Sequence, residues 1–293
     1  MFHSGALRQD LASAALSVET TELGIVARGE KFTGVLEALS STIARRFGQG
    51  VEALRFPPVM PRSDLERIGY FRNFPQLLGV VHCACGQDHL DAVSKADPSF
   101  GDSGLVLTPA ACYPLYAILA ARGVVPCDGV TVQLRSYCFR REPSEDPARL
   151  QSFQMQEFVR IGSADQVSEF RQAWIDRGGA FFSELGLAGE VAIANDPFFG
   201  RAASVMVRDQ RRHALKYELS VVLSAGAPPT ACMSFNHHRD HFTQAFELRS
   251  AQGEVESACV GFGLERTTLA LFATHGLDHD QWPRDILRLL GLG

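Results

Sequence analysis

Several features that mark other classes of protein are missing from this chain of 293 residues. It has no uninterrupted apolar run of about 18 residues, the length that a membrane-spanning helix needs, so we predict no membrane partner. It has no low-complexity segment and no block of like charge, which excludes a long disordered region. Its N-terminus lacks a basic segment followed by an apolar one, so we predict no secretory signal and a cytoplasmic location.

An excess of positive charge is also missing, because 28 Lys and Arg stand against 33 Asp and Glu, for a formal net charge of −5. A protein that follows a phosphate backbone usually carries a basic stripe. The most basic short segment holds Arg208, Arg211, Arg212 and His213. The charge balance therefore argues against a nucleic acid as the main partner.

A disulfide framework is excluded by the cysteines, which are odd in number and scattered along the chain. We expect reduced thiols, so any zinc site has to be assembled from distant positions. His82, Cys83, Cys85 and His89 lack the usual spacing of a structural zinc site, and we expect buried thiols there. The five residues from His237 to His241 include a pair of histidines at helical spacing, but we expect this segment to border a substrate pocket.

Apolar periodicity predicts an α+β fold, in which an antiparallel sheet is flanked by helices. We expect a single domain over 1–293, with a helical insertion near 165–187. Ser63 and Glu66 have the spacing of a helix capping box. The helices are expected at 32–47, 109–121, 169–185 and from Leu264 onward. The strands are expected at 105–108, 130–141, 153–161, 191–194, 203–207, 215–224, 230–235, 244–248 and 255–260.

Two of these strands flank a loop in the segment 137–159, which carries the first chemical signal. Arg140 and Glu142 would share one face of a strand, as would Phe153 and Glu157. An arginine fork grips a phosphate through paired, charge-assisted bonds, and an aromatic ring offers a flat face to a base. An ordinary hairpin with surface ion pairs is the alternative.

A second signal lies in the segment 256–272, where a strand enters Gly261-x-Gly263 and turns into a helix that bears Arg266. Glycines let a backbone approach a ligand closely. This pattern is weak by itself.

Cys112, Glu157 and Cys259 are the third signal, although no spacing rule links them. Two thiolates and a carboxylate form a plausible zinc set with one open position. Each cysteine, taken alone, is more often a small buried core residue. The residues leave both interpretations open.

Taken together, the segments 137–159 and 256–272 resemble motifs 2 and 3 of class II aminoacyl-tRNA synthetases, and the extended run around Pro58 resembles motif 1, the dimer element. Over nearly the whole chain, the sequence resembles the methanogen-type seryl-tRNA synthetases and, more closely, their truncated relatives, the amino acid:carrier protein ligases. In that group, zinc is held by a Cys, the motif 2 Glu and a Cys before motif 3. The resemblance thus implies one Zn²⁺ per subunit on Cys112, Glu157 and Cys259, with the substrate's amine on the open position.

The same resemblance implies Mg²⁺-dependent binding of ATP, with Arg140 and Arg266 as catalytic residues. Ala231 stands where class II enzymes usually keep a magnesium-binding acid, which puts that ligation in doubt and leaves Glu256 as a substitute. The amino acid would contact Glu157, Ser234 and Asn236. The ATP-binding positions are expected to be Arg140, Glu142, Arg149, Leu150, Phe153, Lys216, Ala231, Cys232, Met233, Ser234 and Arg266.

The resemblance further implies a homodimer that makes an aminoacyl adenylate of glycine, or of alanine, and passes it to the phosphopantetheine thiol of a carrier protein. We expect the carrier to dock on the helical insertion near 165–187 or on 208–213, and we expect no tRNA partner. Two alternatives stand beside this interpretation. One is a reduced seryl-type synthetase, and the other is a non-catalytic regulatory protein with the same fold.

Overall fold

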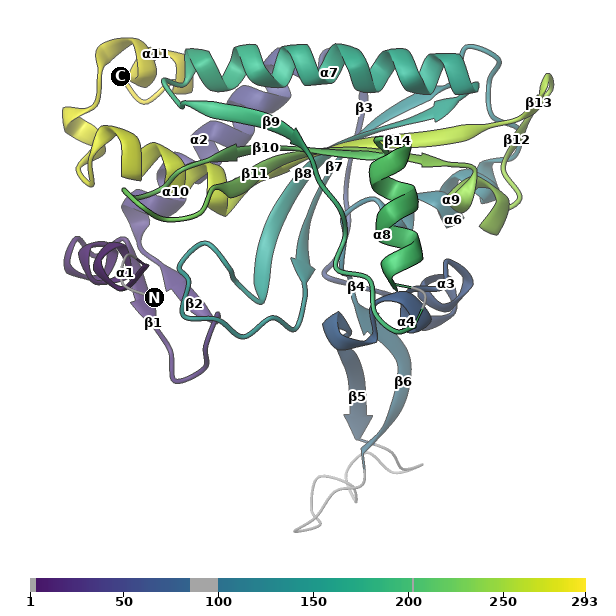
Figure 1. Cartoon of the computed structure of the whole chain (residues 1–293), viewed down its shortest axis with the longest axis horizontal. Coiled ribbons are helices and arrows are strands. Elements are labelled where there is room, and N and C mark those ends of the chain that lie inside the picture. The colour runs from purple at the N-terminus through teal and green to yellow at the C-terminus, as the bar shows by residue number, and fades with distance from the viewer. Residues whose placement is uncertain (1–3, 85–99, 202) are drawn as a thin grey trace.

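The computed structural model describes residues 4–84, 100–201 and 203–293, and its centre is a seven-stranded sheet (Figure 1). The strand order is β3-β7-β8-β14-β11-β10-β9. The edge strand β3 runs parallel to β7, and every other neighbouring pair in this sheet is antiparallel. Its strands are β3 (Glu52–Arg55), β7 (Val130–Phe139), β8 (Ser152–Gly162), β9 (Gly189–Ile193), β10 (Lys216–Val221), β11 (Thr230–Arg239) and β14 (Glu256–Gly263).

Smaller strands build three further sheets. The largest has the order β4-β6-β5, and the other two are the pairs β1-β2 and β12-β13. These strands are β1 (Ser17–Glu19), β2 (Val26–Arg28), β4 (Val59–Pro61), β5 (Val80–Ala84), β6 (Phe100–Leu107), β12 (Arg249–Ser250) and β13 (Gly253–Glu254). The helices are α1 (Ser4–Ser13), α2 (Glu30–Phe47), α3 (Arg62–Arg67), α4 (Tyr70–Asn73), α6 (Tyr113–Arg122), α7 (Ala164–Glu184), α8 (Ala203–Arg212), α9 (His241–Ala245), α10 (Leu264–His275) and α11 (Arg284–Leu290), with 3₁₀ turns at Pro75–Leu77 and His279–Gln281.

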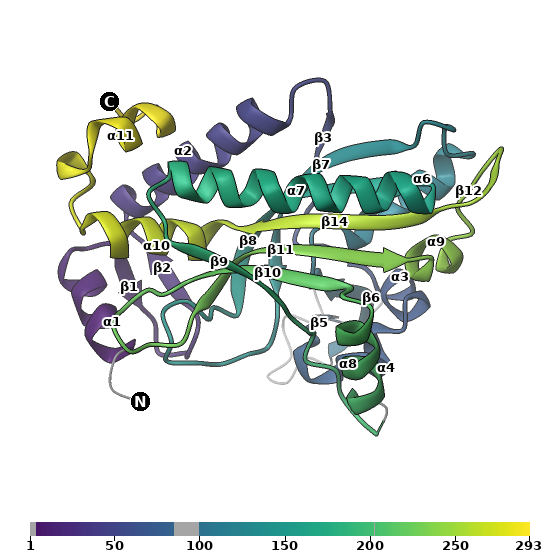
Figure 2. The ribbon, with the colours of Figure 1, turned by 45° about the horizontal axis from the view of Figure 1, so that its top comes forward.

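The long helix α7 covers one face of the large sheet, and α8, α3 and α4 lie on the opposite side (Figures 1 and 2). Neighbouring residues of a strand point to opposite faces. Phe158 and Val260 therefore pack into the core under α7, whereas Val159 and Cys259 pack into the core of the other face. Gly178 allows the close approach of α7, because a Cβ atom there would lie 2.8 Å from the sulfur of Met233.

Most of the predicted elements are confirmed, including both strands of the hairpin at 137–159 and the helix that begins at Leu264. Two predicted strands are wrong. The segment 203–207 begins helix α8, and the segment 244–248 follows from α9 into a turn. No side chain of helix α8 is fully buried, but the half-buried residues 203, 206, 207 and 210 lie on one face of the helix, and this helical periodicity was overlooked.

The capping box predicted at Ser63 is also wrong, because α3 already begins at Arg62 and has Pro61 at its N-cap. A capping box exists instead at the start of α7, where Ser163 and Gln166 exchange hydrogen bonds. Among the residues that the structure describes, no helix is long and apolar enough to cross a membrane.

Candidate active site

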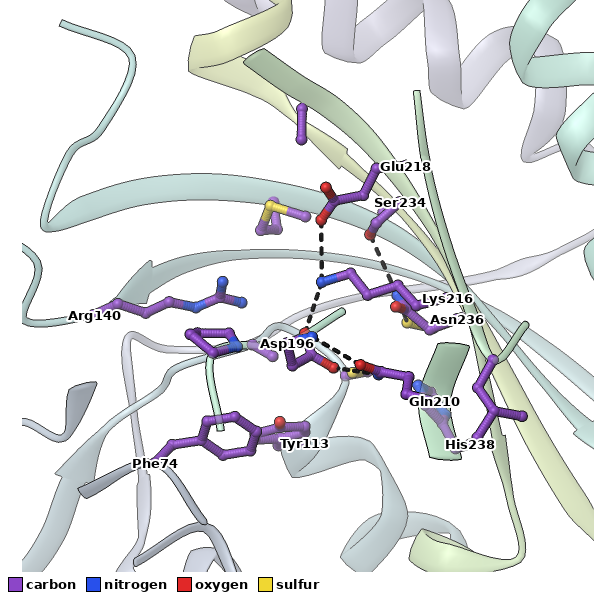
Figure 3. A pocket seen from close by; sticks show the side chains of 18 of the residues that line it. Phe74, Tyr113, Arg140, Asp196, Gln210, Lys216, Glu218, Ser234, Asn236 and His238 are labelled. Carbon is purple, nitrogen blue, oxygen red and sulfur yellow. Dashed lines mark hydrogen bonds and ion pairs between the residues drawn. The ribbon is translucent and has the colours of Figure 1, made fainter. Parts of the chain in front are cut away.

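A cavity of about 630 Å³ opens on the face of the sheet that α7 leaves uncovered (Figure 3). Its walls come from β8, β10, β11 and β14, from the loop after β7, and from α8 with the segment before it. Strand register explains the convergence, since Glu157 of β8 lies opposite Gly261 of β14, which in turn lies opposite Ser234 of β11. The predicted site residues that line the cavity are Cys112, Arg140, Glu142, Leu150, Phe153, Glu157, Lys216, Ala231, Cys232, Met233, Ser234, Asn236, Cys259 and Arg266.

Arg140 follows directly after the end of β7 and is directed into the cavity (Figure 3). Its guanidinium lies 5.4 Å from the centroid of the Phe153 ring, and its Nε donates to the carbonyl of Pro109 at 3.0 Å. The Nη atoms carry the remaining N–H donors of the fork, which is the geometry that grips a phosphate.

Arg149 is the one predicted site residue that does not line the cavity. Its side chain is 49% exposed, and its Nη1 pairs with Glu142 at 3.1 Å. The prediction that Arg140 and Glu142 share a strand face also fails, because β7 ends at Phe139. The amide of Glu142 instead donates to the carbonyl of Arg140 at 2.7 Å.

Arg266 lies in the first turn of α10 and ties two walls of the cavity together. Its Nε donates to the carbonyl of Ala148 at 2.8 Å, and its Nη1 donates to the carbonyl of Ala231 at 3.1 Å. Burial and the nearby Arg140 charge lower the pKa of Arg266. Two arginines therefore face one cavity, an arrangement suited to a ligand with several negative charges.

Asp196 is a cavity residue that the sequence did not reveal. Its carboxylate accepts from Lys216 Nζ at 2.6 Å and from Gln210 of α8 at 2.7 Å, and Glu218 lies 3.1 Å from the same ammonium (Figure 3). Burial opposes the charge on Lys216, but these carboxylates raise its pKa. Asp196 follows β9 in a loop with no recognisable motif, so no local signal could have identified it.

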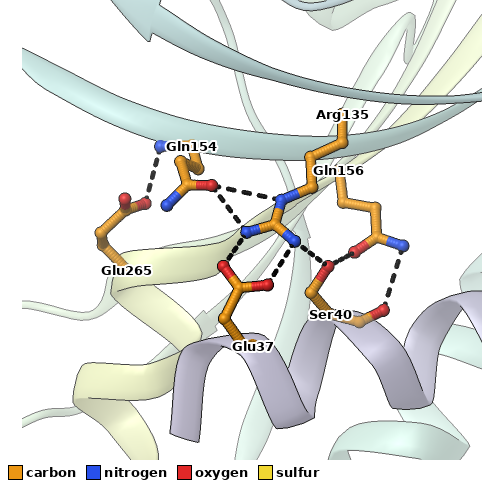
Figure 4. Close-up of polar contacts among 6 residues, drawn as sticks. All are labelled: Glu37, Ser40, Arg135, Gln154, Gln156 and Glu265. Carbon is orange, nitrogen blue, oxygen red and sulfur yellow. Dashed lines mark hydrogen bonds and ion pairs between the residues drawn. The ribbon is translucent and has the colours of Figure 1, made fainter. Parts of the chain in front are cut away.

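A polar network joins α2 to Glu265, which lines the cavity (Figure 4). Arg135 of β7 donates to Glu37 of α2 at 2.7 Å and to the side chain of Gln154 at 2.7 Å. The backbone N–H of Gln154 donates to the carboxylate of Glu265 at 2.8 Å. Burial raises the pKa of Glu265, which lines the cavity beside Arg266, to about 7. The network thus fixes the backbone that carries Phe153 and Arg266.

Cys112, Glu157 and Cys259 come together at the inner end of the cavity. Cys112 immediately precedes α6, and the other two lie on neighbouring strands. Their ligand atoms all lie within 4.8 Å of one another, and all three residues are buried. Three residues that the sequence leaves far apart therefore form one potential metal site.

The chemistry of these three residues fits a zinc ion. The Oε2 atom of Glu157 is buried without a hydrogen-bond partner, and burial raises the pKa of this carboxyl to about 8. A hydrogen bond between the two thiols raises the pKa of Cys112 and lowers that of Cys259. A bound cation would satisfy the unpaired oxygen and favour both thiolates.

The other candidates drawn from the sequence turn out differently. Glu256 does not line the cavity and instead lies 2.6 Å from Nε2 of His237, so it is not placed to replace the acid missing at Ala231. His237 lies in β11 and His241 in α9, and they do not form a pair on one helix, although both border the cavity as predicted. Cys83 is exposed rather than buried, and Cys85 and His89 fall outside the described residues.

Comparison with known proteins identifies the family. The chain is 46% identical, over 97% of its length and 87% of the relative's, to amino acid–acyl-carrier-protein ligase 2 of Bradyrhizobium diazoefficiens. It is 44% identical to ligase 1 of the same organism, over 92% of this chain and 85% of the relative. The chain belongs to the amino acid–acyl-carrier-protein ligase family. The predicted enzyme class, a ligase, is confirmed, although no protein-family model matches the chain.

More distant relatives of this ligase support the predicted fold. The type-2 serine–tRNA ligase of Methanopyrus kandleri is 25% identical over 81% of this chain and 50% of that protein. The crystal structure of A. aeolicus tRNASec in complex with M. kandleri SerRS matches with a TM-score of 0.82 at 22% identity, covering 97% of this chain and 60% of that one. A cytoplasmic serine–tRNA ligase of Naegleria fowleri, in complex with AMP, gives a TM-score of 0.73 at 14% identity, covering 98% and 66%. The class II synthetase fold is thereby confirmed.

Proposed function

We propose that this ligase activates a small amino acid, glycine or alanine, with ATP and transfers it to the phosphopantetheine thiol of a carrier protein. One observation carries the proposal: the Cys112, Glu157 and Cys259 cluster opens into the same cavity as Arg140 and Arg266. A site for an amine-binding cation and a site for phosphates would thus share one cavity.

In the first step, a carboxylate oxygen of the amino acid attacks the α-phosphorus of ATP, and pyrophosphate leaves. Arg140 and Arg266 stabilise the charge that develops on the phosphates, and Phe153 offers its ring to the adenine. Mg²⁺ accompanies ATP on its phosphates. Glu218, which lies opposite Ser234 across β10 and β11, is the cavity carboxylate that would replace the acid missing at Ala231.

Cys112, Glu157 and Cys259 would hold a zinc ion. When bound, zinc supplies an open coordination position that takes the substrate's free amine and orients its carboxylate. Ser234 and Asn236 face the cavity beside this cluster, and Asn236 Nδ2 lies 3.4 Å from the Cys259 sulfur. The backbone of β14 at Gly261 is closely packed, because a Cβ atom there would lie 2.8 Å from the Met155 methyl group and 3.4 Å from Glu157 Cγ. A side chain at position 261 would therefore collide with Met155 beside Glu157.

In the second step, the phosphopantetheine sulfur attacks the carbonyl carbon of the adenylate, and AMP leaves. Carrier proteins are typically acidic, so docking calls for a basic patch on a chain whose net charge is −5. Helix α8 offers Arg208, Arg211 and Arg212 at the rim of the cavity, whereas α7 turns its apolar face to the core. Of the two docking surfaces expected from the sequence, this favours 208–213. A cytoplasmic location suits a reaction that consumes ATP.

The proposed function is tested by identifying the molecule that accepts the activated amino acid. Purified ligase, ATP and radioactive glycine or alanine are incubated with a phosphopantetheinylated carrier protein, with the same carrier lacking its arm, or with bulk tRNA. We expect a hydroxylamine-sensitive label on the armed carrier alone. Labelling of tRNA would instead indicate a reduced seryl-type synthetase, and ATP binding without any product would indicate a regulatory protein.

A further inference from the structure

A charged network on one wall of the cavity joins the loop after β9 to β10 and to α8 (Figure 3). Asp196 accepts from the Lys216 ammonium at 2.6 Å through Oδ1 and from Gln210 Nε2 at 2.7 Å through Oδ2. The backbone N–H of Asp196 donates to the side-chain oxygen of Gln210 at 2.8 Å. Gln210 therefore holds Asp196 at two points, and both carboxylate oxygens are in use.

The backbone on both sides of this network is also fixed. Ala194, directly after β9, donates its N–H to the carbonyl of Lys216 at 3.0 Å, so the pairing of β9 with β10 sets Asp196 beside Lys216. The carbonyl of Gln210 accepts from the N–H of Leu215 at 2.9 Å. The ion pair is thus held in place by strand pairing and by α8, and not by its own attraction alone.

The ion pair is largely shielded from solvent, since the side chain of Lys216 is 12% exposed and that of Asp196 is 33% exposed. Burial opposes the charge on Asp196, yet Lys216 lowers the pKa of this carboxyl, so it is ionised at neutral pH. Glu218 lies 3.1 Å from the same ammonium. Two of the three N–H donors of the ammonium are thereby used, which also fixes the direction of the third.

Lys216 and Arg140 extend toward each other from different walls of the cavity (Figure 3). Two cations that face each other repel, and an anion between them removes the repulsion. In the proposed function, that anion is the phosphate chain of ATP. The guanidinium of Arg140 is planar and rigid, whereas Lys216 carries its ammonium on a flexible four-carbon stem. Lys216 therefore needs partners that hold its ammonium in position.

We propose that Asp196, itself held by Gln210, is a positioning residue that fixes the Lys216 ammonium so that it meets the phosphates of ATP opposite Arg140. The inference rests on the proposed function, in which ATP binds in this cavity. Asp196 acts through Lys216, because its two carboxylate oxygens are already occupied by Lys216 and Gln210. The side of α8 that carries Gln210 thus contributes to ATP binding, whereas its exposed arginines are left for the carrier.

Binding of a non-hydrolysable ATP analogue, measured by calorimetry on the purified full chain with Mg²⁺, tests this role without any turnover. Asp196→Asn removes the charge, and its NH2 group cannot accept one of the two side-chain hydrogen bonds that Asp196 accepts. We expect the Kd for the analogue to rise about 10-fold, the size of one charge-assisted hydrogen bond. The mere loss of a negative charge near the phosphates would instead lower the Kd.

A second background separates positioning from a general structural role. Lys216→Met should itself raise the Kd, and it leaves no ammonium to position, so adding Asp196→Asn should cause no further rise. Gln210→Met removes the two bonds that hold Asp196, and we expect a smaller rise than in Asp196→Asn. Asp176→Asn, on the exposed side of α7, is the control and should keep the Kd of the wild type. Thermal melting checks that each variant folds.

Three results would overturn the inference, and they are distinguishable. If Asp196→Asn binds the analogue as tightly as the wild type, or more tightly, Asp196 does not position Lys216. If Asp196→Asn raises the Kd by the same factor in the wild-type and Lys216→Met backgrounds, its role is only structural. If the wild type itself does not bind the analogue, the proposed function fails, and the role of Asp196 fails with it.

Discussion

Arg140 is the cavity residue whose guanidinium is held in one direction by its neighbours. It is half-buried, it lies over the Phe153 ring, and its Nε is already held by the carbonyl of Pro109. The planar fork beyond Nε is therefore fixed in direction before any phosphate ligand binds. Such preorganised donors are worth more than flexible ones, because they need no reorganisation in the transition state.

Arg140→Lys keeps the positive charge and removes the fork. We expect amino-acid-dependent ATP–pyrophosphate exchange to fall about 100- to 1,000-fold, mainly through kcat, since a lysine cannot make the paired bonds. Arg141→Lys is the matched control, because Arg141 is the exposed neighbour outside the cavity. Equal rates in Arg140→Lys and wild type would show that the fork does not contact the phosphates.

The raised pKa of Glu265 makes the free energy of unfolding depend on pH. Burial raises its pKa in the folded protein to about 7 from the ordinary value of 4.5. A raised carboxyl pKa means that the folded state binds the proton more tightly, so this contribution is present below pH 4.5 and is lost as pH rises through 7. Its size is at most about 3 to 4 kcal/mol, from about 1.4 kcal/mol per pKa unit.

Glu265→Gln keeps an acceptor for the Gln154 amide and cannot ionise. We expect the free energy of unfolding of wild type to decrease, relative to this variant, between about pH 5 and 8, as measured by urea denaturation at several pH values. Glu254→Gln, at an exposed strand end, serves as control. A constant difference between wild type and Glu265→Gln across that range would contradict the raised pKa.

At the scale of single elements, α8 combines the features of a docking surface. It buries none of its side chains, it carries three arginines, and Gln210 anchors it to Asp196 inside the cavity. One donor of the Arg211 guanidinium is already used within the chain, because its Nε donates to the Asn195 side chain at 3.1 Å. Arg208 and Arg212 are therefore the better positions for testing charge alone.

Reversal of both charges, in Arg208→Glu with Arg212→Glu, should weaken carrier aminoacylation through a raised KM for the carrier, and the salt dependence of that KM should diminish. Exchange of pyrophosphate should stay near the wild-type rate, since neither residue lines the cavity. The pair Arg284→Glu with Arg288→Glu, on α11 at the opposite end of the molecule, is the control (Figure 1). An unchanged KM would exclude α8 as the docking surface.

The elements also show how much of the fold and the site could be predicted from the sequence. The strands that carry Phe153, Glu157 and Cys259 were predictable because they are long, apolar and bounded by turn residues. Helix α8 was predicted to be a strand because the run 205–207 contains two β-branched valines, whereas the half-buried face formed by 203, 206, 207 and 210 has helical spacing. Asp196 was missed because it lies in a loop without a motif, and its partner Lys216 comes next to it only in the folded chain.

At the scale of the molecule, the open edge of the large sheet supports the proposed homodimer. Strand β3 is one of the two edge strands of this sheet, and large apolar side chains are exposed on its neighbour β7 and on β5 and β6 of the three-stranded sheet, including Tyr137 and Leu105. An open edge with exposed apolar groups favours association. We expect sedimentation to give twice the 32.0 kDa mass of one chain. A single-chain mass at micromolar concentration would contradict the dimer.

The proposed activity requires one cavity to hold both ATP and the amine of the amino acid, the latter on a metal ion. Its most direct test is ATP–pyrophosphate exchange by zinc-loaded protein with each of the twenty amino acids, beside Cys112→Ala as the variant that lacks one metal ligand. We expect exchange with glycine or alanine in the wild type and its loss in Cys112→Ala, with the variant still folded. No exchange with any amino acid, or full exchange in Cys112→Ala, would contradict it.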